Sequence, residues 1–263
     1  MVIDRVRREM TSRWQLGGET VLVRGLNSAW RAKIVCGRIN LRTSPVELAE
    51  FFDLFREPEW LPRYNLGPMQ QILVVRIKPD GVRLAEPVQW GLVPSWSRDT
   101  TGAAHMINAR SDSVADKPAF RVPFRQQRCL IPASGFYEWQ HIDRKTKQAW
   151  HIFRTDGQPL ILAGLWEHWR APDGDILESC AAMTTEANDS MAEIHTRMPV
   201  ILSREMADVW LDPHLTDTVP LREMLVPCPS DWLAKNPVSQ FVNQIHNDSP
   251  ECIRPVKSLR TLF

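Results

Sequence analysis

The sequence contains few of the residues on which several protein classes depend. Its five cysteines are an odd number and none of them forms a C-x-x-C pair, which argues against a disulfide framework and a zinc knuckle. No stretch approaches the ~20 apolar residues that span a bilayer, and the N-terminus lacks the apolar run and cleavage site of a secretory signal. Apolar residues make up 43% and charged residues 24% of the 263 positions, a balance that excludes disordered and fibrous proteins. We therefore expect a globular protein of a reducing cytoplasm.

Net charge is also small, at +1, but it is unevenly distributed along the chain. Residues 1–35 carry seven basic and three acidic groups, whereas the other 228 residues carry 25 basic and 28 acidic groups. Phosphate neutralisation supplies most of the non-specific affinity for nucleic acids. Because the protein is not basic as a whole, a nucleic acid would have to bind to a local patch.

Tyrosine is scarce, with two residues, while tryptophan is abundant, with 11. The segment Trp90–Trp96 combines two of these tryptophans with glycine and proline. It can plug a core, or it can form a wall for a splayed base or sugar, because an indole ring is a good stacking platform.

Periodicity and turn residues predict many short elements. A capping box of Ser44 and Glu47 starts a helix over 45–56, and a second helix begins at Ser203. Strands are predicted over 71–77, 82–88, 128–133, 135–141, 148–153, 159–166 and 176–184. We expect an α+β fold with a mixed or antiparallel β-barrel-like core and flanking short helices.

Glu138 has the most informative surroundings of any titratable residue. Strand alternation places it on the same face as Phe136, with Tyr137 and Trp139 on the other face. A carboxylate flanked by so much aromatic surface is desolvated, which raises its pKa toward the range useful for proton transfer. The alternative is an edge carboxylate paired with a nearby lysine or arginine.

Three further residues are candidates for chemistry. Cys36 precedes a glycine and an arginine, Asn108 stands two residues before Arg110, and His195 is a titratable group beside Arg197. Each also has a structural interpretation: a small buried hydrophobe, a turn residue, and a capping or buried histidine. None of these residues decides the function by itself.

Six short motifs occur here in the order in which they occur in the SRAP (SOS-response-associated peptidase) family, and the sequence resembles that family from Cys36 to about Val256. Each motif alone is weak, but six in one order are specific. They are Cys36–Arg38, Arg63–Asn65, Trp90–Trp96, Ile107–Arg110, Gly135–Trp139 and Ile194–Pro199, and the later segments Pro237–Ser239 and Ile253–Val256 also match.

The resemblance implies a function, because SRAP proteins process abasic sites. Family members form a covalent DNA–protein crosslink at abasic sites in single-stranded DNA, through a cysteine that becomes the N-terminal residue. Carried over, the nucleophile is Cys36 and the supporting catalytic residues are Asn108, Glu138 and His195. The residues implied in DNA contact are Arg38, Asn65, Trp90, Trp96, Arg110 and Arg197.

The same resemblance implies an enzyme with autopeptidase (hydrolase) and lyase-type activity that needs no cofactor and no metal. We expect a monomer whose partner is single-stranded DNA containing abasic sites, with no membrane association. The expected location is the cytoplasm, in association with the nucleoid when the protein is bound to DNA.

The sequence departs from the family immediately before Cys36. The family has Met at this position, whereas this chain has Val35 and 34 residues ahead of it. A peptide bond on the nitrogen of Cys36 leaves no amine to react. Either translation starts at a GTG codon at position 35, or the extension is real and must be cut off or has silenced the crosslinking. We expect an extension over 1–35, one domain over 36–256 and a tail over 257–263.

Two alternative functions stay open at this point. In a thiol hydrolase, Cys36 would react through sulfur with His195 as base and Asn108 as orienting group. A non-catalytic module would bind single-stranded DNA through the Trp90–Trp96 segment and the arginines.

Overall fold

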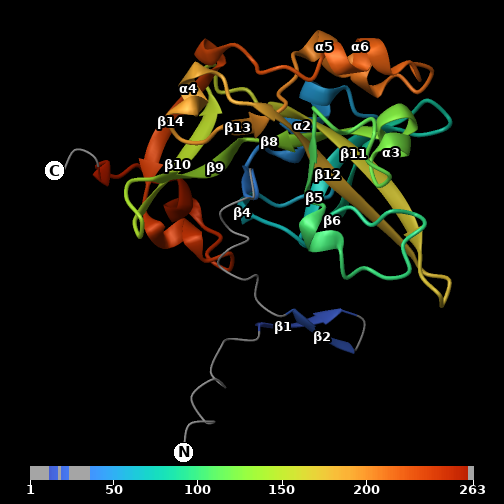
Figure 1. Cartoon of the computed structure of the whole chain (residues 1–263), viewed down its shortest axis with the longest axis horizontal. Helices are drawn as coiled ribbons and strands as arrows, with labels where there is room; N and C mark the ends of the chain where they lie inside the picture. Colours follow the sequence, from blue (N-terminus) through green and yellow to red (C-terminus); the bar gives the residue numbers. More distant parts are fainter. Residues whose placement is uncertain (1–11, 17–18, 24–35, 260–263) are drawn as a thin grey trace, which may run out of the picture. The chain divides into compact units, whose positions relative to one another are not determined.

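The computed structural model describes residues 12–16, 19–23 and 36–259, and the chain divides into two compact units, residues 1–34 and 35–263 (Figure 1). In the first unit, β1 (Ser12–Leu16) and β2 (Glu19–Val23) pair in antiparallel fashion. Residues 1–35 show no clean sequence period, and this hairpin was not predicted.

The core of the second unit is a closed barrel of five strands. These follow the order β11-β8-β5-β6-β12, and β12 pairs back with β11 to close the ring. All neighbours are antiparallel except β6 and β12, which are parallel. Closure gives each strand of the ring a paired neighbour on both sides. The predicted mixed barrel-like core is therefore confirmed. The five strands are β5 (Gln71–Ile77), β6 (Arg83–Trp90), β8 (Arg128–Ala133), β11 (Leu160–Arg170) and β12 (Ile176–Glu186).

A second, antiparallel sheet has the order β14-β10-β9-β3-β4. Ser134 is the only residue between β8 of the barrel and β9 of this sheet. A Cβ atom at Gly135 would lie 2.3 Å from Nε2 of His151, so glycine is required where β9 begins. The five strands are β3 (Ile39–Leu41), β4 (Arg63–Leu66), β9 (Gly135–His141), β10 (Lys147–Arg154) and β14 (Leu233–Val238).

One face of this sheet is covered by the C-terminal part of the chain. Tyr137 and Ala149 pack in a buried cluster with Val238, Val242 and Cys252, of which the last two lie in the 3₁₀ helices η3 (Gln240–Asn243) and η4 (Pro250–Ile253). Because side chains alternate along a strand, Glu138 points to the opposite face.

The helices are short. The predicted capping box starts α2 (Pro45–Phe52), which ends four residues before the predicted end because Asp53 adopts a left-handed conformation. Ser203 caps α5 (Arg204–Leu211) as predicted. Within the described ranges, no helix has the length and apolar character needed to cross a membrane. The other helices are η1 (Ala103–His105), α3 (Arg121–Gln126), α4 (Asp189–Ala192), α6 (Thr218–Glu223) and η2 (Ser230–Trp232).

Arg128 joins the C-terminal ends of two helices to the barrel. Its guanidinium donates to the carbonyls of Phe124 and Arg125 in α3 (3.1 and 2.6 Å) and of Trp210 in α5 (2.6 Å). It also donates to the carbonyls of Asp212 and Leu215, at 2.6 and 2.8 Å. A cation is favourable where helix carbonyls have no intrahelical partner.

We expect Arg128→Met to lower the free energy of unfolding by about 3 kcal/mol, because it leaves several buried carbonyls without a donor. Urea denaturation measures the loss. Arg121→Met changes an exposed arginine of α3 and is the control, with an expected effect within about 0.5 kcal/mol. Equal losses in the two variants would contradict the role of Arg128.

Candidate functional site

The register of β3 and β9 brings Cys36 to Glu138. Ile39 pairs with Phe136, and the N–H of Tyr137 donates to the carbonyl of Arg38, at 2.9 Å. The chain preceding β3 therefore continues alongside β9, and the backbone N–H of Cys36 donates to Oε1 of Glu138. The carboxyl group of Glu138 thus contacts the backbone nitrogen of Cys36.

Both residues are buried, with exposed fractions of 0% for Cys36 and 3% for Glu138. Cys36 has a φ of 45°, in the left-handed region that non-glycine residues seldom adopt. Such backbone strain is typical of functional sites.

Burial determines the protonation state of this pair. Desolvation raises the pKa of Glu138 to about 7, against hydrogen bonds from the N–H groups of Cys36 and Trp139 that lower it. Burial and the neighbouring Glu138 also raise the pKa of the Cys36 thiol well above its usual range. At neutral pH the sulfur is therefore a thiol, while Glu138 is close to half ionised and can both take up and release a proton.

His195 lies between α4 and the short strand β13 (Arg197–Pro199). Its Nδ1 accepts the backbone N–H of Arg197 at 3.1 Å. Burial lowers the pKa of His195, and the positive charges of Lys147, Arg197 and His141 lower it further. The imidazole is therefore neutral at pH 7, with its proton on Nε2.

Gln140 links the strand of Glu138 to the segment that carries His195. It lies two residues beyond Glu138 on the same face of β9 and is buried. Its Nε2 donates to the carbonyl of Glu193 at 2.5 Å, and its Oε1 accepts from Nε1 of Trp150 at 3.1 Å. Nζ of Lys235 also contacts this segment, since it donates to Oε2 of Glu193 at 2.7 Å. These contacts tie the histidine-bearing segment to the sheet.

Three residues near Glu138 and His195 were not predicted to belong to the site: Gln140, Lys147 and Lys235. Lys147 is close enough to lower the pKa of both Glu138 and His195 electrostatically. For Gln140, its place two residues after Glu138 in a predicted strand was an available signal. The two lysines carried no local signal, because their partners come from distant segments.

Asn108 begins β7 (Asn108–Arg110), which pairs in parallel with β12. In this register Asn108 lies opposite Ala182, and Arg110 lies opposite Thr184. Thr184 also pairs with Pro199 of β13. The topology therefore brings the Asn108–Arg110 and Arg197–Pro199 motifs to the same end of β12.

Two residues predicted to contact DNA lie in the interior, with exposed fractions of 0% for Asn65 and 1% for Trp90. Nδ2 of Asn65 contacts the carbonyls of Gln244 and Asn247, at 3.0 and 2.7 Å, and Nε1 of Trp90 donates to the carbonyl of Ile107 at 2.9 Å. Their burial corrects the prediction that they contact DNA: both side chains hold neighbouring segments in place.

The other four residues that were predicted to contact DNA differ in their exposure and in their partners. Trp96 is 65% exposed. Arg38 lies over the ring of Trp139 and donates through Nη1 to Asn65 and to the carbonyl of Val242, at 2.7 and 2.8 Å. Arg110 and Arg197 both approach the carboxylate of Asp112.

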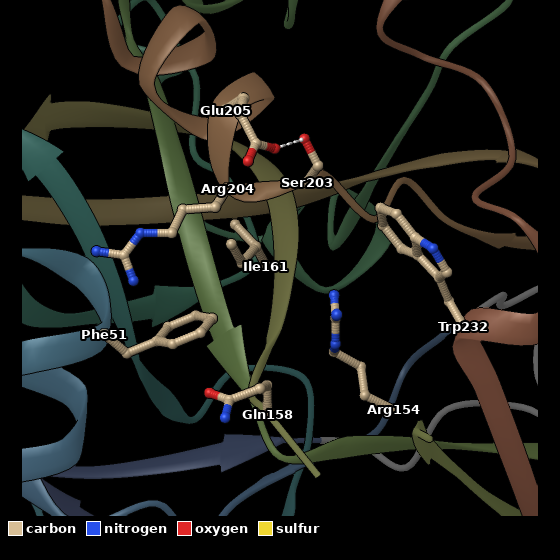
Figure 2. Close-up of a pocket in the computed structure, with 8 residues that line it drawn as sticks. All are labelled: Phe51, Arg154, Gln158, Ile161, Ser203, Arg204, Glu205 and Trp232. Atoms are coloured by element: carbon tan, nitrogen blue, oxygen red, sulfur yellow. Dashed lines mark hydrogen bonds between the residues drawn. The ribbon is translucent and has the colours of Figure 1, made fainter. Parts of the chain in front are cut away.

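A separate cavity of about 230 Å³ holds none of the four candidate catalytic residues. Figure 2 shows two arginines entering it, and each lies over an aromatic ring: Arg204 over Phe51 at 5.4 Å and Arg154 over Trp232 at 5.0 Å. Each arginine is also paired with an aspartate, so neither brings an unbalanced positive charge. Across the described ranges, no group of three or more His, Cys, Asp or Glu side chains is placed to hold a metal ion.

The fold and the site together define a class of protein: a mixed β-barrel protein in which a titratable carboxyl group contacts the backbone nitrogen of a buried cysteine. The sequence profile of the family described as SOS response associated peptidase (SRAP) matches residues 35–245. The chain belongs to the SRAP family, as its motifs predict.

Relatives agree with this assignment, and a solved structure shares the fold. The chain is 39% identical over 222 residues to abasic site processing protein YoqW of Bacillus subtilis, covering 83% of this chain and 99% of YoqW. It is 30% identical over 243 residues to abasic site processing protein HMCES of Mus musculus, covering 78% of this chain and 68% of HMCES. A solved structure from Bacteroides thetaiotaomicron shares the fold, with a TM-score of 0.77, 22% identity and coverage of 84% of this chain and 100% of that one.

Proposed function

We propose that the protein recognises abasic sites in single-stranded DNA and forms a covalent crosslink to them through Cys36, once the residues before Cys36 have been removed. The observation that carries this proposal is the contact between the Cys36 nitrogen and Glu138, a carboxyl group with a pKa of about 7. Relatives that are named abasic site processing proteins support the choice of substrate.

Freed from its peptide bond, the Cys36 nitrogen is an α-amine with an ordinary pKa of about 7.7–8.0. A tenth or so of this amine is neutral at pH 7, and Glu138 can accept the proton of the remainder. The neutral amine attacks C1′ of the ring-opened sugar to give a carbinolamine, and loss of one water gives an imine.

The thiol then makes the adduct durable. Sγ of Cys36 adds to the imine carbon and its proton passes to the nitrogen, which closes a five-membered thiazolidine ring. This step is intramolecular, for which effective molarities reach about 10⁵ M or more. An imine alone hydrolyses, and it can also lose the 3′-phosphate by elimination, which is the lyase-type outcome. Ring closure removes the imine and so stops both reactions.

The supporting residues have distinct proposed roles. Glu138 shuttles protons while the carbinolamine loses water. His195, neutral and with its proton on Nε2, assists the opening of the sugar by proton transfer at the ring oxygen. Asn108 orients the amine or the leaving hydroxyl group.

Single-stranded DNA is the preferred form because stacking in a duplex hides the lesion, whereas an abasic gap costs little to splay open. We assign phosphate contact to Arg38, Arg110 and Arg197, and base stacking to the exposed Trp96. The location of these residues on strands and loops outside the barrel core supports this assignment.

Two routes are proposed to a chain that begins at Cys36. In the first, translation starts at position 35 and the initiator Met is then removed. In the second, the longer chain is cleaved before Cys36, and an autopeptidase activity of the site itself is the simplest agent. The raised pKa of the Cys36 thiol does not favour a general thiol hydrolase, because a thiolate is the reactive form of cysteine.

The test uses protein that begins at Cys36 and a single-stranded oligonucleotide from which one uracil has been excised. We expect a heat-stable species on a denaturing gel, with a mass equal to protein plus DNA minus one water. The undamaged oligonucleotide is the substrate control, and Cys36→Ala, which keeps the amine but cannot close the ring, is the protein control. Absence of a stable adduct with the parent protein would refute the proposal.

A further inference from the structure

The carboxylate of Asp112 lies between two arginines from different motifs. It accepts from Nη2 and Nε of Arg110, at 2.5 and 3.2 Å, and it lies 3.6 Å from Nη1 of Arg197. Asp112 follows β7 by two residues, whereas Arg197 begins β13. The tertiary structure therefore creates a site in which one anionic oxygen is shared by two guanidinium groups.

The two arginines differ in exposure and surroundings. The Arg197 side chain is 12% exposed, and its Nη2 donates to the carbonyl of Thr184 at 2.7 Å. Its Nε is buried and has no hydrogen-bond partner among the described residues. The Arg110 side chain is 59% exposed. Arg197 is thus held by the surrounding protein, whereas the guanidinium of Arg110 is accessible to a ligand.

Arg197 is influenced by several neighbouring charges. Burial and the like charge of Arg110 lower the pKa of Arg197, while Asp112 opposes that effect. Glu186, which pairs with Arg197 in the register of β12 and β13, also opposes the effect but forms no ion pair with it, so two guanidinium groups share the carboxylate of Asp112 in direct contact. Each oxygen of a phosphodiester presents the same kind of acceptor to such a pair, because arginine binds carboxylate and phosphate through the same fork of donors.

We propose that Asp112 occupies, in the DNA-free protein, the place of a backbone phosphate between Arg110 and Arg197, and that bound DNA displaces it. This proposal rests on the proposed function, in which these arginines bind single-stranded DNA. Displacement is easy because the Asp112 side chain is 49% exposed and an exposed ion pair contributes little net free energy. The consequence is weaker reversible binding to any phosphodiester backbone, so that the protein leaves undamaged DNA quickly and is retained where it reacts.

The experiment compares the reversible affinities of Asp112→Asn and the parent for an undamaged, fluorescein-labelled single strand. Both proteins begin at residue 36 and carry Cys36→Ala, so that no covalent capture contributes. Fluorescence anisotropy is measured at several salt concentrations. We expect Asp112→Asn to bind about 3- to 10-fold more tightly at low salt, with a slope of log K against log salt steeper by about one.

Asp116→Asn is the matched control. It removes the same charge from an exposed residue four positions away, and we expect less than about a 2-fold change. A second control combines Asp112→Asn with Arg110→Gln. The gain in affinity that Asp112→Asn causes should be smaller in this background, because Arg110, the cation that loss of Asp112 makes available to DNA, is absent.

The outcomes separate this proposal from the proposed function. Equal or weaker binding by Asp112→Asn would show that Asp112 only positions the arginines, and an equal gain in Asp116→Asn would show a general charge effect; either result overturns the proposal while crosslinking by the parent stands. If neither protein binds the strand, the proposal also falls. Failure of the parent to crosslink an abasic strand instead refutes the proposed function.

Discussion

Protein that begins at Cys36 is expected to crosslink abasic single-stranded DNA, whereas the same protein with residues 1–35 still attached is expected to form no heat-stable adduct. The nitrogen of an internal residue belongs to an amide, whose lone pair is delocalised into the peptide bond. It can donate its N–H to Glu138, as it does here, but it cannot attack an aldehyde. The expected difference is therefore close to all-or-none on a denaturing gel.

Two variants that begin at residue 36 separate the contributions of nitrogen and sulfur. Cys36→Ser keeps the amine but replaces the thiol, so we expect an adduct that is lost on heating. Acetylation of the terminal nitrogen of the parent keeps the thiol and should abolish the adduct. Intact-mass measurement must accompany each assay, because a stable adduct on a chain with an unbroken bond before Cys36 would contradict the amine mechanism.

Glu138→Gln is expected to slow crosslinking by about 10²-fold or more while making the protein more stable at alkaline pH. The loss of rate follows from removing a general acid–base group. With residues 1–35 attached, burial raises the pKa of Glu138 to about 7. In the parent the α-ammonium group of Cys36 lowers this pKa, so ionisation of Glu138 should raise the rate at and below about pH 7. That part of the pH profile should be absent in the variant.

The gain in stability comes from removing a buried group that is costly to ionise in the folded protein. The pKa of Glu138 is about 7 in the folded protein, against an ordinary value of 4.5, so the folded state holds its proton more tightly than the unfolded state. Near pH 4 the carboxyl is protonated in both states, and its ionisation then costs no folding free energy. As the pH rises through 7, the buried group must ionise, at a cost that approaches about 3 kcal/mol.

Urea denaturation of the chain with residues 1–35 attached, at pH 5 and pH 8, measures this effect. Glu138→Gln should exceed the parent in stability mainly at pH 8, whereas Glu223→Gln, which changes an exposed carboxylate of α6, should behave the same at both pH values. A pH-independent loss of stability in Glu138→Gln would mean that packing rather than charge dominates at this position. An unchanged crosslinking rate would remove Glu138 from the mechanism.

Elements with strong local signals could be predicted from the sequence. The hairpin of β5 and β6, the starts of β8 and β9, and the capped starts of α2 and α5 all match their predicted positions closely. Strands such as β3 and β7, with three residues each, were missed. They exist because distant partners pair with them, and so short a segment carries no period of its own.

The candidate site was likewise predictable where the signal was local and not where it depended on distant residues. The aromatic neighbours of Glu138 predicted a raised pKa, and the structure agrees in direction. No local pattern distinguished Asn65, which holds a C-terminal loop through its amide, from an asparagine that contacts DNA. Nor did any pattern predict that Asp112 lies between Arg110 and Arg197, because Arg197 comes 85 positions after Asp112 in the sequence.

By itself, the amino-acid order determined the family motifs, the strand-rich architecture and which cysteine is the candidate nucleophile, because these depend on neighbours within a few positions. Only the tertiary structure decided which atom of Cys36 contacts Glu138, how strongly that carboxyl group is desolvated, and which arginines share an anionic partner. Solvent exclusion and electrostatic contact depend on distance in space, and the barrel and its adjoining sheet bring together segments that are far apart along the chain.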